Sequence, residues 1–73
     1  MPIIHVQLLA GRSPELKREL IRELTDATER ALGSERESIR VLLTEVAAED
    51  WAIGGTPISE RRRAEEPAAE EGT

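Results

Sequence analysis

The chain opens with Met1-Pro2-Ile3-Ile4-His5-Val6-Gln7-Leu8-Leu9-Ala10-Gly11-Arg12, and this stretch decides the fold. Ile4, Val6 and Leu8 share one face, while the other face mixes apolar and polar side chains. This alternation is typical of a β-strand over Ile3–Leu9 with one clearly buried face. Ala10-Gly11-Arg12 is typical of the turn that leaves such a strand. Such a strand needs a partner strand elsewhere in the chain.

A long helix is predicted from Pro14 to about Leu32. Ser13 can cap free backbone N–H groups, and Pro14 suits the first helical position because its missing N–H would have no partner there. Gly33 suits the left-handed residue that ends a helix. On the polar face, Asp26 is spaced to pair with Arg22 and Arg30. The predicted buried stripe consists of Leu16, Leu20, Leu24, Ala27 and Ala31, widened by Ile21, Thr28 and Leu32.

A second strand is predicted at Ile39–Val46, after the polar connection Ser34–Ser38. Two strands joined by a long helix form a β-α-β unit with parallel strands and a right-handed crossover. Residues 47–50 form a loop or a short helical turn, and Gly54-Gly55 marks the turn of a short hairpin.

The fold class is therefore α/β (α+β), with a single β-α-β unit and a short C-terminal hairpin over residues 1–63. Residues 64–73 are Glu, Ala, Pro, Gly and Thr, which cannot bury enough surface to offset the entropy of ordering. We expect them to form a disordered acidic tail.

The composition favours a protein that needs partners. The chain has 73 residues, no cysteine, one histidine and one aromatic residue, Trp51. Below roughly 70–80 residues, a single core rarely supplies more than about 3–5 kcal/mol of net stability. Disulfides and thiolate metal ligands are excluded, and one histidine does not make a metal site by itself. A lone β-α-β unit also leaves one sheet face and both edges open. Two copies can form a four-stranded sheet, and stacked dimers can cover its open face.

The charge pattern excludes other classes of partner. The formal net charge is −5, whereas nucleic-acid binding needs a basic face. The basic run Arg61-Arg62-Arg63 is short and is followed by glutamates. Ile3–Leu9 is too short for a signal peptide or a transmembrane segment. We expect a soluble cytoplasmic protein that binds neither nucleic acid nor membrane.

Pro2 is the first candidate for chemistry. If Met1 is removed, Pro2 supplies a secondary amine, and desolvation or nearby cations can lower the pKa of an amine enough for it to act as a base. Proline at the second position is also common and often inert. If Met1 is retained, the Pro2 nitrogen is part of an amide and cannot be a base.

Two arginines could act with this amine. Arg12 lies at the strand exit and Arg40 lies within an apolar strand, so together they suit a substrate with two carboxylates. Each could equally form an ordinary ion pair at an interface. Trp51 could line a pocket or anchor an interface. Ser38 can cap a turn, and His5 is most simply a strand residue.

Taken together, these residues resemble the 4-oxalocrotonate tautomerase family over about residues 1–63. The matching segments are Pro2 after Met1, Leu9-Ala10-Gly11-Arg12-Ser13, Ser38-Ile39-Arg40-Val41, Thr44-Glu45 and Trp51-Ala52-Ile53-Gly54-Gly55. The resemblance implies a β-α-β subunit assembled as a hexamer, a trimer of dimers, whose sites draw on several subunits.

The resemblance also implies roles. Pro2 is the general base, and Arg12 and Arg40 bind the carboxylates and polarise the 2-keto group. Trp51 takes the place of the family's pocket phenylalanine, and Leu9 matches a position whose backbone takes part in the site. Ser38, in the matching segment that opens the second strand, is a further substrate-binding candidate.

The implied function is a cofactor-independent tautomerase acting on a small 2-hydroxydienoate or 2-oxo acid such as 2-hydroxymuconate. Two alternatives stay open: a pathway-specific homologue with a monocarboxylate substrate, and a non-catalytic subunit of a hetero-oligomer. Trp51 is larger than the phenylalanine that it replaces, and Ala10 stands where an acidic residue is often found. These two differences leave the substrate undecided. Ile53 counts against hydrolytic dehalogenation, because related haloacrylate dehalogenases carry a water-activating glutamate there.

Overall fold

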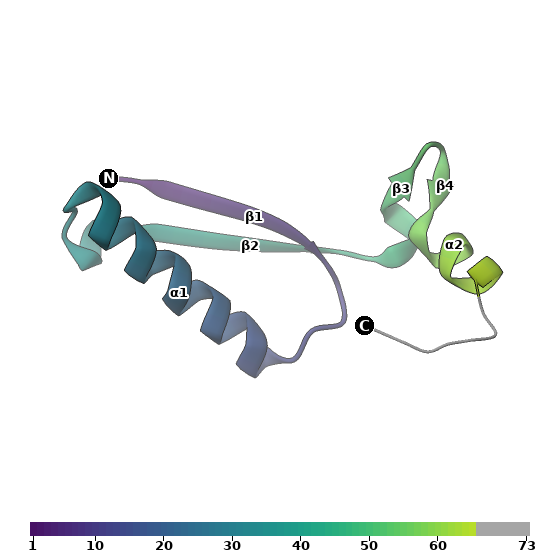
Figure 1. Cartoon of the computed structure of the whole chain (residues 1–73), viewed down its shortest axis with the longest axis horizontal. Coiled ribbons are helices and arrows are strands. Elements are labelled where there is room, and N and C mark those ends of the chain that lie inside the picture. The colour runs from purple at the N-terminus through teal and green to yellow at the C-terminus, as the bar shows by residue number, and fades with distance from the viewer. Residues whose placement is uncertain (66–73) are drawn as a thin grey trace.

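The computed structural model describes residues 1–65 and confirms the predicted β-α-β unit followed by a hairpin (Figure 1). In chain order its elements are β1 (Ile3–Leu9), α1 (Pro14–Leu32), the 3-10 helix η1 (Arg36–Ser38), β2 (Arg40–Val46), the 3-10 helix η2 (Ala48–Asp50), β3 (Ala52–Ile53), β4 (Thr56–Pro57) and α2 (Ile58–Glu65).

β1 and β2 are parallel and pair in an unbroken register from Ile3 opposite Arg40 to Leu9 opposite Val46. The ladder extends one residue at its start, where the Arg40 N–H donates to the Pro2 carbonyl at 3.0 Å. β2 begins one residue later than predicted. The reason is that the Ile39 N–H donates to the Arg36 carbonyl at 3.1 Å and so closes η1.

Helix α1 has the predicted ends. The Ser13 hydroxyl accepts the Leu16 N–H at 3.2 Å. Gly33 adopts a left-handed φ of 68°, and its N–H donates to the Glu29 carbonyl at 2.9 Å. Pro14 stands at the start of the helix as expected. These local signals are enough to fix both ends of α1.

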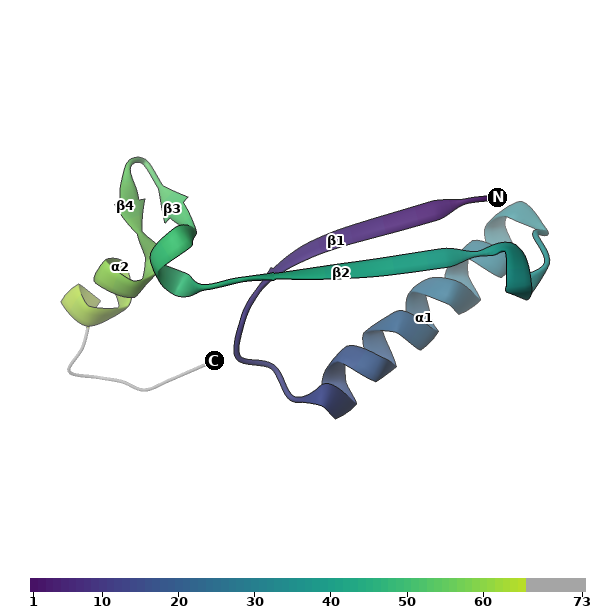
Figure 2. The same ribbon diagram turned by 180° about the vertical axis from the view of Figure 1, so that it is seen from behind.

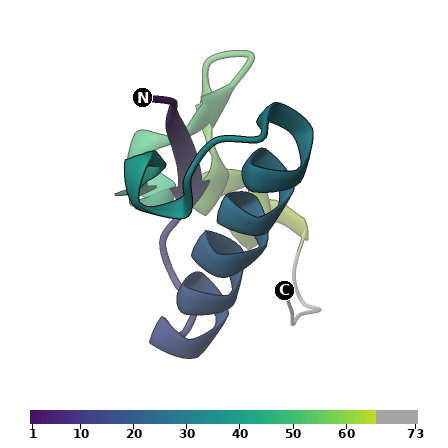
Figure 3. The same ribbon diagram turned by 90° about the vertical axis from the view of Figure 1, so that its left-hand side faces the viewer.

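Helix α1 lies across one face of the two-stranded sheet (Figures 1 and 3). Ile4, Val6 and Leu8 are half-buried on that face, as predicted, and Ile39 beside it is the buried apolar residue of the core at 9% exposure. The other sheet face is open, with Ile3 at 66% and Leu42 at 49% exposure.

The predicted helix stripe is wrong at several positions. Ala27 and Ala31 are exposed, and Leu16 and Leu32 are 60% and 65% exposed. Strands of a sheet lie only about 4.8 Å apart, so two strands cover a narrow band of a helix. Lys17 lies within that band, and its Nζ contacts Glu45 Oε2 at 2.9 Å.

The C-terminal part stands beyond the end of β2 (Figures 1 and 2). β3 and β4 pair in antiparallel fashion around Gly54 and Gly55, whose φ values of 59° and 89° suit glycine in a tight turn. Helix α2 follows directly, where the sequence predicts no helix, and the Ile58 N–H donates to the Trp51 carbonyl at 2.6 Å.

The predicted tail begins at residue 64, but α2 continues to Glu65. Residues 66–73 of that tail lie outside the described residues. Within residues 1–65, neither helix has the length and apolar character needed to cross a bilayer.

Candidate active site

The candidate site residues form two groups at opposite ends of the β1–β2 ladder. Pro2, Ser38 and Arg40 lie at the end where both strands begin. The Arg40 N–H donates to the Pro2 carbonyl at 3.0 Å, and the Arg40 guanidinium Nη1 donates to the Glu37 carbonyl at 2.8 Å. The Ser38 hydroxyl donates to the Glu35 carbonyl at 2.8 Å, and the Ser38 N–H donates to the same oxygen at 2.9 Å, so both groups close the η1 turn.

Pro2 is held by its carbonyl group, which leaves its nitrogen outside the strand ladder. The Pro2 ring is half-buried, whereas Met1 is 80% exposed. While Met1 is present, the Pro2 nitrogen is part of an amide and carries no N–H. Pro2 therefore needs no hydrogen-bond acceptor at its nitrogen, and only its carbonyl takes part in the sheet. Removal of Met1 therefore creates an amine without breaking the Pro2–Arg40 hydrogen bond.

Leu9 and Arg12 lie at the other end of β1. Arg12 Nη1 donates to the Leu9 carbonyl at 3.1 Å, so this arginine folds back onto the strand end. Trp51 follows η2 beyond the end of β2, is half-buried, and accepts the Ile58 N–H on its backbone carbonyl. Arg12 is exposed, and its remaining donors are available to a ligand or a neighbouring chain.

The length of β1 separates the two groups. β1 contains seven residues, and at about 3.3 Å per residue the strand alone spans roughly 20 Å. No arginine side chain bridges such a distance, so Pro2 and Arg12 of one chain do not meet over one small substrate. If Pro2 and Arg12 serve one substrate, they must therefore come from different chains.

The open sheet face between these ends carries one side-chain hydrogen bond. His5 Nε2 and Thr44 Oγ1 lie 2.6 Å apart across β1 and β2. This pair satisfies both polar side chains within the sheet and agrees with the reading of His5 as a strand residue. Ile3 and Leu42 flank it on the same face, which is the surface that a neighbouring subunit would cover.

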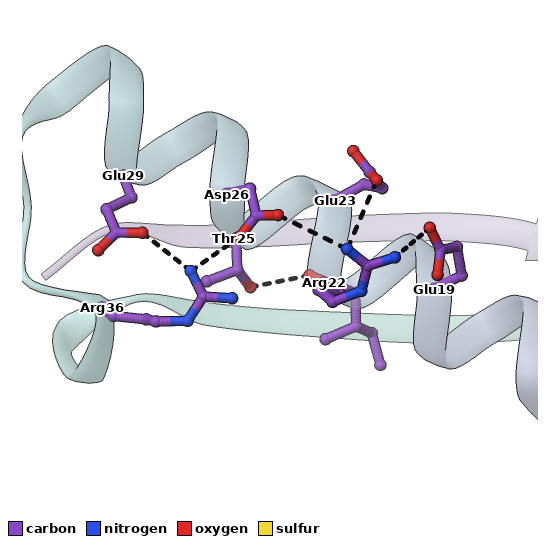
Figure 4. A network of polar contacts seen from close by, with 8 residues as sticks. Glu19, Arg22, Glu23, Thr25, Asp26, Glu29 and Arg36 are labelled. Atoms are coloured by element: carbon purple, nitrogen blue, oxygen red, sulfur yellow. Dashed lines mark hydrogen bonds and ion pairs between the residues drawn. The ribbon is translucent and has the colours of Figure 1, made fainter.

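An ion-pair network links α1 to η1, and sequence reasoning missed its central residue (Figure 4). Arg36 Nη1 lies 2.8 Å from Asp26 Oδ1 and 2.8 Å from Glu29 Oε1. Asp26 thus pairs with Arg36 rather than with the predicted Arg30, while its predicted contact with Arg22 is long, at 3.9 Å. Hydrogen bonds to Asp26 and Glu29 raise the pKa of Arg36, which keeps its guanidinium charged.

A signal for Arg36 was present in the sequence. Asp26 and Glu29 are three residues apart near the end of a predicted helix, and therefore share one face. A basic residue in the connection that follows can reach both carboxylates. Which residue reaches Asp26 and Glu29 depends on the conformation of the turn at residues 34–38. The sequence of these residues alone does not predict that conformation.

Comparison with known proteins identifies the family. A family model described as "Tautomerase enzyme" matches residues 2–61. The chain belongs to the tautomerase family. A probable tautomerase of Ralstonia nicotianae is 48% identical over 59 residues, covering 81% of this chain and 84% of the relative. A 2-hydroxymuconate tautomerase of Pseudomonas putida is 44% identical over 63 residues, covering 86% of this chain and all of the relative, 100%.

Solved structures of this tautomerase family share the fold. TomN, a 4-oxalocrotonate tautomerase homologue of the tomaymycin biosynthetic pathway, superposes with a TM-score of 0.84 at 40% identity, covering 92% of this chain and 100% of that one. A heterohexameric 4-oxalocrotonate tautomerase from Chloroflexus aurantiacus gives a TM-score of 0.80 at 34% identity, covering 85% and 100% of the two chains. The predicted tautomerase-type fold is thereby confirmed, and family membership supports an isomerase.

Proposed function

We propose that this tautomerase is a cofactor-independent isomerase that converts a small dienol such as 2-hydroxymuconate into its ketone, with Pro2 as the general base. The observation that carries the proposal is the position of Pro2. It is tied to Arg40 by the first hydrogen bond of the sheet, yet its nitrogen is not used by the fold. The similarity to a 2-hydroxymuconate tautomerase supports this choice of substrate.

The reaction needs a general base and positively charged side chains near the oxygen that gains negative charge. The Pro2 amine, freed by loss of Met1, takes the proton of the dienol hydroxyl, and the resulting dienolate takes the proton back on carbon to form the ketone. General acid–base catalysis of this kind contributes typically about 10²–10⁴-fold. Arginines near the oxygen that gains charge stabilise the dienolate, which is an electrostatic contribution of its own.

The same arginines prepare the base. A cation near the Pro2 amine disfavours its protonated form and lowers its pKa, and partial burial acts in the same direction. Arg40 lies beside Pro2 through the backbone and is the nearest candidate for this effect. Arg12 and the Leu9 backbone of another chain supply the opposite wall, and Trp51 excludes water from it.

The separation of the two partial sites supports an oligomer as the active form. The open sheet face with Ile3 and Leu42 exposed gives a surface for such an assembly. We assign a homohexamer built as a trimer of dimers, in which every chain contributes one end to one site and the other end to another. A hexamer agrees with the heterohexameric relative from Chloroflexus aurantiacus and with the length of β1, and the choice of identical chains is our proposal.

Two measurements test the proposal. Native mass analysis of the purified protein should give a chain that begins at Pro2. The Pro2→Ala variant should then ketonise 2-hydroxymuconate at least about 100-fold more slowly than the unchanged protein, which is the low end of general-base catalysis. A Pro2→Ala variant with unchanged activity would refute the proline mechanism.

A second candidate function is supported by the similarity to TomN, which belongs to a biosynthetic pathway. In that case the substrate carries one carboxylate, and either Arg12 or Arg40 is dispensable. Comparing kcat/KM on a dicarboxylate and on its monocarboxylate analogue, for Arg12→Ala and Arg40→Ala, separates the two. The heterohexameric relative supports the third possibility, a non-catalytic subunit, for which native mass analysis would find Met1 retained.

A further inference from the structure

The η1 turn connects three parts of the molecule that bear on the candidate site. It follows α1, it precedes β2, and Arg40 begins β2 beside Pro2. The turn is only three residues long, Arg36–Ser38. Its own hydrogen bonds close the turn, but its position relative to α1 depends on the contacts between the two.

Arg36 is the side chain that attaches η1 to α1. Its Nη1 lies 2.8 Å from one oxygen of Asp26 and 2.8 Å from one oxygen of Glu29, on the outer surface of the helix (Figure 4). These residues stand three apart on α1 and hold the guanidinium between them. The two contacts span ten and seven positions of sequence and therefore restrain the loop after Gly33, not the helix alone.

The backbone of η1 in turn holds Arg40. The Arg36 carbonyl accepts the Ile39 N–H at 3.1 Å, and the neighbouring Glu37 carbonyl accepts the Arg40 guanidinium at 2.8 Å. Ile39 is buried between these contacts. A displacement of η1 therefore moves the acceptor of the Arg40 side chain, and moves the Arg40 N–H that holds the Pro2 carbonyl.

We propose that Arg36 is a positioning residue for catalysis, because it clamps η1 to α1 through Asp26 and Glu29 and thereby sets the place of the Arg40 guanidinium and of Pro2. This inference rests on the proposed function of Pro2 and Arg40. Arg36 itself contacts no candidate substrate group. Its effect passes through the Glu37 carbonyl and the first hydrogen bond of the sheet.

The test compares Arg36→Gln with Arg22→Gln. Arg22 is a matched control because it lies on α1 and contacts the carboxylates Glu19, Glu23 and Asp26, but it does not touch η1. Arg36→Gln should raise KM for 2-hydroxymuconate about three- to tenfold, the scale of losing two exposed ion pairs. Arg22→Gln should leave KM within about twofold, as for an ordinary surface substitution.

The pH profile separates positioning from general weakening of the fold. When Arg40 is less well placed, the Pro2 amine that it serves, in whichever chain of the oligomer, loses part of its neighbouring positive charge, so the pKa seen in the acidic limb of kcat/KM should rise. A loss of folded protein lowers the whole profile without moving that limb. Arg36→Lys keeps the charge but not the guanidinium fork, and should recover part of the loss in KM.

A double variant, Asp26→Asn with Glu29→Gln, removes the clamp while leaving Arg36 in place. The double variant should show the same KM and pH profile as Arg36→Gln. If Arg36→Gln does not assemble, the double variant is measured in its place. The inference is overturned if these variants match Arg22→Gln in both KM and pH profile while Pro2→Ala is inactive. Activity retained in Pro2→Ala would instead overturn the proposed function.

Discussion

Mixing two inactive variants, Pro2→Ala and Arg12→Ala, is expected to restore about a quarter of the wild-type activity when the chains assemble at random. The reason is the length of β1. Seven residues of strand separate the Pro2 end from the Arg12 end, roughly 20 Å at about 3.3 Å per residue. A site that uses both residues must therefore take them from different chains.

The magnitude follows from counting sites. A working site needs Pro2 from a chain that carries the Arg12 substitution and Arg12 from a chain that carries the Pro2 substitution. In an equal mixture each condition is met for half of the chains, so about one site in four is intact, whatever the symmetry of the oligomer. Each variant alone should retain no more than about 1% of activity, given the usual size of base and oxyanion contributions.

The assay uses the two variants denatured separately, mixed in equal amounts, refolded together, and measured for ketonisation of 2-hydroxymuconate. Each variant refolded alone is the control for refolding yield. Activity in the mixture equal to the average of the two controls would refute the two-chain site. A mixture of Pro2→Ala and Leu16→Ala, in which Leu16 is an exposed residue of α1, is the reference for dilution of active chains: half of its sites keep Pro2, so it should show about half of wild-type activity.

Three further predictions concern folding and assembly. Ile39→Ala, at 9% exposure, should lower the free energy of unfolding by about 2–4 kcal/mol in denaturant titrations at fixed protein concentration, whereas Ile53→Ala, at 50% exposure, should cost less than about 1 kcal/mol. Ser13→Ala should cost about 1 kcal/mol through loss of the α1 cap, and Ser13→Asp should retain most of that stability. Leu42→Asp should shift sedimentation velocity profiles towards smaller species, because Leu42 lies on the open face of the sheet, which we propose that a neighbouring chain covers. Leu16→Asp, in the first turn of α1, should leave the profiles unchanged.

The sequence predicted best where the signal is local. Ser13, Pro14 and Gly33 act on the backbone within a few residues, so both ends of α1 followed from them. The alternation around Ile4, Val6 and Leu8 likewise gave the buried face of β1. The candidate site residues rested on resemblance, and the structure adds that they fall into two groups at opposite ends of the sheet.

Features that depend on distant contacts were not predictable in this way. Helix α2 lacks an apolar period and is set by the hairpin before it, where Ile58 bonds to Trp51. Ala27 and Ala31 fit a helical stripe, but they are exposed because a two-stranded sheet is too narrow to cover them. The partner of Asp26 depended on the conformation of η1, which brings Arg36 rather than Arg30 to it.

The way Pro2 is held has a consequence for how the protein matures. The sheet holds Pro2 through its carbonyl oxygen, and Met1 projects into solvent at 80% exposure. Trimmed and untrimmed chains should therefore fold alike and enter the same oligomers. If Pro2 is the base, as we propose, specific activity rises in proportion to the fraction of trimmed chains, so a preparation can pass every test of folding and oligomeric size while its turnover depends on how completely Met1 has been removed.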